Sequence, residues 1–166
     1  MTNLLAKAIV TRLNEALAQL TLRAPGDPAT YQAPQVYQEA LPAKALPEDP
    51  DPAPYVLVRS TGGLLEEEDG LILHAADVAL TCVAYSTEGD AAGAQDALNL
   101  ARWCLAALQQ KPILDSRFER LDLSWSQPIE QTPPYYTAQV TTRWRFQEPA
   151  ASLGPEMEVE TYGSGY

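Results

Sequence analysis

The chain has 166 residues, of which 46% are hydrophobic, and its 22 acidic and 11 basic side chains give a formal charge of −11. This length and composition predict a single globular domain, and the acidic charge argues against a protein that grips the nucleic acid backbone. No apolar run approaches the length of a membrane span, and no charged-then-apolar leader begins the chain. We therefore expect a soluble, unsecreted protein with no membrane partner.

Residues 2–20 have the pattern of an amphipathic helix, because apolar side chains recur at three- and four-residue steps. One face carries Leu4, Leu5, Ala8, Ile9, Leu13, Ala16, Leu17 and Leu20. From residue 21 to residue 54 this pattern gives way to polar sequence interrupted by proline, in which only residues 35–38 resemble a short strand. A loop this long is usually functional or mobile in a compact domain.

The next segment predicts a long β-hairpin with an acidic tip. Residues 55–60 are apolar at both odd and even positions, and residues 71–85 resume an extended pattern. The outer half of this hairpin should project beyond the sheet as an arm. Its tip carries Glu66, Glu67, Glu68 and Asp69. Such a charge run is usually a solvated turn; the alternative is that it lines a channel or docks to a partner.

Residues 78–110 predict one strand, one polar turn and one helix that together form the core. In the strand, Val78, Leu80 and Cys82 share one face. The apolar stripe of the helix contains Ala94, Ala97, Leu98, Ala101, Cys104, Leu105 and Leu108. Packed layers lie about 10 Å apart, which is too far for a disulfide bond between the strand and the helix. Cys82 and Cys104 are therefore predicted to be free buried thiols in a reducing compartment.

A second apolar patch on the same helix faces away from this stripe. At about 100° per residue, Trp103 points to the opposite side, with Leu100 and Ala107 within one turn of it. Either the long loop or the first helix covers this patch, or the patch is a contact between subunits.

Two further strands complete the expected fold. Residues 117–127 and 136–146 alternate between apolar and polar side chains, which predicts a second hairpin joined by the proline-rich residues 128–134. The predicted fold class is α+β: an antiparallel sheet of about four strands, two helices on one face and a long hairpin arm. Residues 1–148 should form this domain, and residues 149–166 a flexible, disordered acidic tail.

The sequence contains no motif that predicts enzyme chemistry. It has no phosphate-binding loop, no glycine-rich dinucleotide turn and no paired-cysteine motif. The lone histidine, His74, is interpreted as structural, and the acids at the hairpin tip lack the alternating spacing of a calcium loop. We expect no catalytic residue, no cofactor and no metal.

Several of these segments resemble the tail terminator, or tail-completion, proteins of long-tailed bacteriophages. The likeness is one of pattern over most of residues 1–148, without an invariant catalytic signature. It rests on Val36-Tyr37, the proline-laden loop, Pro54-Tyr55-Val56-Leu57-Val58, the strand ending in Ala84-Tyr85-Ser86, the helix from about Ala91 to Leu108, and the final strand through Trp144 and Phe146. The acidic C-terminal extension is not part of the family pattern.

The resemblance implies a virion protein that is assembled in the host cytoplasm and resides in the tail or neck. It implies a homo-oligomeric ring, commonly of six subunits, that caps the tail tube, stops its polymerisation and offers a surface for head–tail joining. The implied partners are the tail tube protein and the head–tail connector, with DNA passing through without specific binding. The alternatives are a head–tail connector or stopper, or a non-enzymatic adaptor domain.

Overall fold

The structure, a computed structural model, describes residues 1–26 and 30–149 of the chain. Its two helices are α1 (Thr2–Leu17) and α2 (Asp90–Gln110). The strands are β1 (Leu22–Ala24), β2 (Thr30–Gln32), β3 (Gln35–Gln38), β4 (Tyr55–Glu68), β5 (Leu71–Tyr85), β6 (Ile113–Leu114), β7 (Phe118–Ser126) and β8 (Tyr135–Pro149). The predicted C-terminal tail, residues 149–166, lies outside the described residues except for Pro149, which ends β8.

The main sheet has six strands in the order β3-β4-β5-β8-β7-β6, and β1 pairs with β2 in a separate two-stranded sheet. The pair β3–β4 is parallel, whereas the other pairs of the main sheet are antiparallel. The predicted antiparallel sheet of about four strands is therefore wrong. The four long strands and their two hairpins form as predicted, but β3 and β6 extend the sheet at both sides. Residues 35–38 were predicted as a short strand, but no local pattern indicated that this strand joins the sheet, and β6 is too short to show a period of two.

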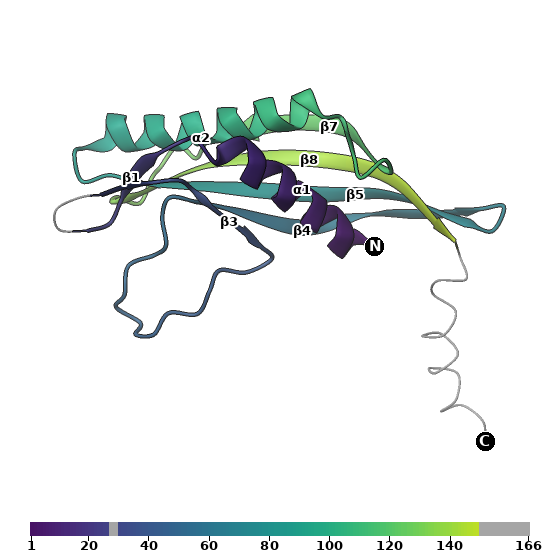
Figure 1. Ribbon diagram of the computed structural model, residues 1–166, viewed down its shortest axis with the longest axis horizontal. Coiled ribbons are helices and arrows are strands. Elements are labelled where there is room, and N and C mark those ends of the chain that lie inside the picture. Colours follow the sequence, from purple (N-terminus) through teal and green to yellow (C-terminus); the bar gives the residue numbers. More distant parts are fainter. Residues whose placement is uncertain (27–29, 150–166) are drawn as a thin grey trace, which may run out of the picture.

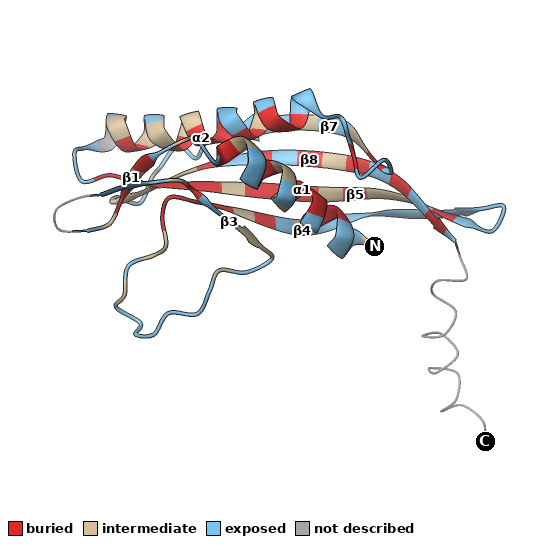
Figure 2. Ribbon diagram, viewed as in Figure 1, coloured by how far each residue is buried: buried red, intermediate tan, exposed pale blue. Residues whose placement is uncertain are grey.

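Both helices lie on one face of this sheet (Figure 1). That face buries alternate residues of the two central strands, as a sheet covered on one side requires. The buried row of β5 contains Ala76, Val78, Leu80, Cys82 and Ala84, and that of β8 contains Tyr136, Ala138, Val140, Thr142, Trp144 and Phe146. The burial is concentrated beneath the helices, whereas the outer end of the β4–β5 hairpin is mostly exposed (Figure 2).

The buried stripe of helix α2 is rotated around the helix relative to the stripe that the sequence predicts. Leu100 and Ala107 are 0% and 2% exposed, so they belong to the core and do not form an outward patch with Trp103. Leu98 and Leu105, placed in the predicted stripe, are only partly buried. The physical reason is that α2 packs both on the sheet and beside α1, so two neighbouring sectors of its surface are covered.

The two cysteines are free and buried, as predicted. They nevertheless touch, because small residues allow α2 to approach the sheet closely. A hydrogen bond with the Cys104 thiol, together with burial, raises the pKa of the Cys82 thiol well above its usual value. The Cys82 thiol is therefore a protonated, space-filling group of the core.

Gly93 lets α2 approach β8 closely. A Cβ added at Gly93 would lie within the ring of Tyr136, which is 1% exposed. Glycine normally weakens a helix relative to alanine by about 1 kcal/mol. Here the missing side chain is what allows the aromatic ring to pack beneath the helix.

Replacing Leu100 with alanine tests the corrected position of the core. Leu100→Ala should lower the free energy of unfolding by about 2 to 5 kcal/mol, because it leaves a cavity in the core. Urea unfolding measures this loss. Leu46→Ala, in the exposed loop before β4, is the matched control and should change stability little. Equal losses in the two variants would contradict the burial of Leu100.

Candidate functional site: two interaction surfaces

The first surface is the arm, the part of β4, β5 and β8 that extends beyond the helices (Figure 1). The sequence predicted a two-stranded arm. In the structure β8 pairs with β5 as far as Leu71↔Pro149, so the arm has three strands. A third strand gives a hairpin the support that an isolated pair lacks in water.

The arm begins at an irregularity in β4. The register of β4 against β5 shifts between Ser60 and Gly62. At Gly63 a Cβ would lie 2.6 Å from the carbonyl oxygen of Ala75, so only glycine fits there without a shift of the backbone. The two consecutive glycines leave this part of β4 without side chains. A shallow groove of about 310 Å³ borders them and also includes Leu65 and His74.

On the helix-side face of the arm, His74 is held by contacts within the chain. Its Nε2 lies 2.6 Å from Oε1 of Glu148, and its ring stacks on Phe146 with centroids 4.4 Å apart. Both residues of the pair are largely buried. This geometry supports the structural interpretation of the lone histidine.

On the opposite face, an ion pair crosses the base of the arm. Asp77 and Arg143 are directly opposed on β5 and β8, and Nε and Nη2 of Arg143 donate to the two carboxylate oxygens at 2.7 and 3.1 Å. The hydrogen bonds from Arg143 lower the pKa of Asp77 and raise that of the guanidinium. Bidentate geometry makes this one of the better-defined pairs of the exposed sheet face.

The outer part of the arm is exposed and contains both apolar and acidic side chains. Leu64 and Leu65 are 63% and 62% exposed. Glu66, Glu67 and Glu68 end β4, and Asp69 begins the turn with a φ of 52°. The structure thus brings the four predicted acids together at the tip of the arm, beyond the helices.

Two edges of the main sheet are open among the described residues. On the outer edge of β4, β3 pairs with positions 55–58, and the Glu39 carboxylate accepts a hydrogen bond from the Ser60 amide at 3.1 Å. Thr61–Glu68 therefore have β5 on one side and no strand on the other. On β7, β6 and the Pro112 carbonyl occupy positions 118–120, which leaves Leu121–Ser126 open. Sequence reasoning missed these edges because strand order depends on long-range pairing.

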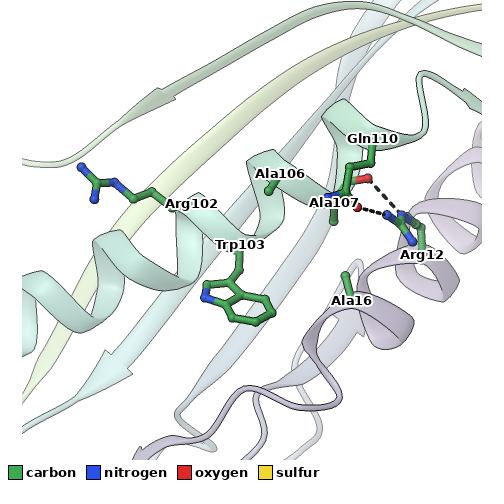
Figure 3. Close-up of a pocket in the computed structure, with 7 residues that line it drawn as sticks. All are labelled: Arg12, Ala16, Arg102, Trp103, Ala106, Ala107 and Gln110. Atoms are coloured by element: carbon green, nitrogen blue, oxygen red, sulfur yellow. Dashed lines mark hydrogen bonds between the residues drawn. The ribbon is translucent and has the colours of Figure 1, made fainter.

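The second surface is a groove of about 430 Å³ between α1 and α2, in which Trp103 lies (Figure 3). Trp103 remains 43% exposed, so α1 flanks its ring without covering it. Arg12 closes one end by donating from Nε to the Ala107 carbonyl and from Nη2 to Gln110 Oε1, each at 3.0 Å. Of the predicted patch of Leu100, Trp103 and Ala107, only Trp103 is available to a partner.

The described residues contain no group of three or more His, Cys, Asp or Glu side chains arranged to hold a metal ion. No helix within the described ranges is long and apolar enough to cross a membrane. No known family profile matches this sequence, and no curated protein matches it.

The Asp77–Arg143 pair predicts a pH-dependent contribution to stability. Because the folded-state pKa of Asp77 is lowered, its contribution is present above the unfolded pKa of about 4 and is lost as pH falls through the folded value. Asp77→Asn should therefore destabilise the protein more at pH 7 than at pH 2, as measured by urea unfolding. Glu48→Gln, in the exposed loop, serves as the control. A difference between Asp77→Asn and wild type that is the same at both pH values would contradict this assignment.

Proposed function

We propose that this chain is a structural virion protein that forms a ring, caps the tail tube of a long-tailed phage, ends tail polymerisation and provides a surface for head–tail joining. The observation that carries the proposal is the three-stranded arm. It carries Leu64 and Leu65, whose side chains are mostly exposed. Exposed apolar side chains on a rigid projection favour a role in assembly.

A ring is the assembly that such a subunit favours. The arm and the rest of the body are different surfaces, so a contact between them on neighbouring copies is head-to-tail and closes into a ring when the rotation permits. The resemblance to tail terminators adds the expected number of six subunits. In this proposal the Trp103 groove is a second contact surface, available to a neighbouring subunit, the tail tube protein or the connector.

The acidic composition suits a ring through which DNA passes. A subunit with a net charge of −11 has few basic side chains to bind DNA phosphates, so DNA is not retained. The exposed carboxylates of the arm tip would add to this repulsion if they line the channel. The same surfaces also fit a head–tail connector or stopper, or an adaptor domain, and the experiment below separates these functions.

The decisive experiment combines the purified protein with tail tubes that lack a terminator. Electron microscopy should show rings at the end of each tube, and tube growth from added tube protein should stop. Trp103→Ala should keep the wild-type fold by circular dichroism and weaken the contact that uses the groove. Rings that bind only isolated connectors would favour the connector alternative, and a monomer that binds neither would favour an adaptor.

The charge predicts how assembly responds to salt. Six copies would carry a formal charge of about −66, and this self-repulsion opposes ring closure at low ionic strength. At 0.15 M salt the screening length is about 8 Å, so added salt should increase the oligomeric fraction. Sedimentation velocity at low and moderate salt measures the effect. Dissociation of the oligomer with rising salt would instead mean that ion pairs hold the interface.

A further inference from the structure

We infer that the subunits join by extending the sheet: the open edge of β7 in one copy pairs with the open edge of β4 in the next. This inference rests on the proposed ring and names the surface that forms it. The partner is a second copy because the two open edges are complementary to each other. The complementarity has three parts: strand direction, shape and charge.

The strand directions match. Each step from β4 through β5 and β8 to β7 is antiparallel, so β4 and β7 run in opposite directions. When β7 of one copy lies beside β4 of another in a continuous sheet, the new pair is therefore antiparallel as well. The contact is head-to-tail, since each copy contributes a different edge, and it covers the open lengths of β4 and β7 once the ring closes.

The shapes match through Trp125. This residue lies opposite the buried Val140, so its side chain is on the helix side of the sheet, where it is 56% exposed. The groove beside Gly63 opens along β4, and Leu65 on its border lies opposite His74, also on the helix side. The groove has a volume of about 310 Å³, which offers room for an indole. Trp125 of one copy fills the groove beside β4 of the next.

The charges match at the other end of the pair. With Trp125 opposite Gly63, Leu123 lies opposite Leu65, and the paired length ends just before Arg120, whose backbone amide already donates to the Pro112 carbonyl. Buried Nε of Arg120 has no hydrogen-bond partner among the described residues. A glutamate at the acidic end of β4 is a suitable acceptor for it. On the helix-free face this register places Leu64 opposite Ser124.

Lysine substitutions at the two edges test the pairing. Leu65→Lys and Trp125→Lys replace exposed side chains, so both variants should fold as wild type by circular dichroism. Each alone should remain at the mass of one 18.1 kDa subunit in light scattering. Mixed in equal amounts they should form dimers, because each retains the edge that the other has lost. Ile129→Lys, fully exposed between β7 and β8, is the control and should assemble normally.

A double-cysteine variant tests the register independently of any loss of assembly. Leu64→Cys combined with Ser124→Cys should give a ladder of disulfide-linked oligomers under mild oxidation, because directly opposed residues lie within reach of a bridge. Leu64→Cys combined with Ser126→Cys, two residues out of register, should cross-link far less.

The outcomes separate the edge pairing from the proposed function. Wild-type assembly by both lysine variants, or equal cross-linking by the two cysteine pairs, would overturn the edge pairing and its register while leaving the ring proposal standing. A wild-type protein that stays monomeric alone and with tail tubes would overturn both.

Discussion

The pairing of β5 with β8 is the constraint on which the rest of the structure depends. The two strands pair in continuous register from Leu71↔Pro149 to Tyr85↔Tyr135. Each belongs to a different hairpin, so this ladder joins the two halves of the chain. It also sets the buried row on which α2 packs, with Cys82 and Val140 on the helix side. A shift of β8 by one residue relative to β5 would turn the buried row of β8 toward the opposite face.

The same ladder divides the molecule into a covered body and a bare arm. The helices cover the sheet only over part of its length, and beyond them β4, β5 and β8 continue as a narrow three-stranded projection (Figure 1). Within the arm, the His74–Glu148 pair and the stacking on Phe146 fill the helix side in place of a helix. On the other face, Asp77 and Arg143 secure the base. The arm is thus held by its own side chains and leaves its outer strand free.

This division separates the surfaces that stabilise the fold from the strand edges that the proposed assembly would use. Its core needs only the two helices and one sheet face, so the strand edges are not required for folding. Natural sheets usually protect such edges with charge, bulges or covering loops. Here Glu39 protects the edge of β4 beside the body, and the 111–117 turn protects the edge of β7 beside the body. The remaining lengths of β4 and β7 are open and run in opposite directions. An edge of this kind favours pairing between copies.

Local sequence patterns determined the elements of the fold. Apolar side chains recur at every second position in residues 136–146 and at three- and four-residue steps in both helices. These patterns depend only on residues close together in the sequence, so α1, α2 and the two hairpins were predicted correctly. The acidic arm tip was also predicted, because a turn between two strands is a local feature. The resemblance to tail terminators and the functions it implies remain proposals.

Only the tertiary structure decided which surfaces are free. The parallel pairing of Gln35–Gln38 with β4 joins segments separated by a long loop, and no local pattern specifies it. Leu100 and Ala107 became core because α1 packs beside α2, which a single helix pattern cannot reveal. Likewise, β4 and β7 became edges through strand order. These features depend on contacts between residues far apart in the chain, whereas periodicity reports only which side of one element is apolar.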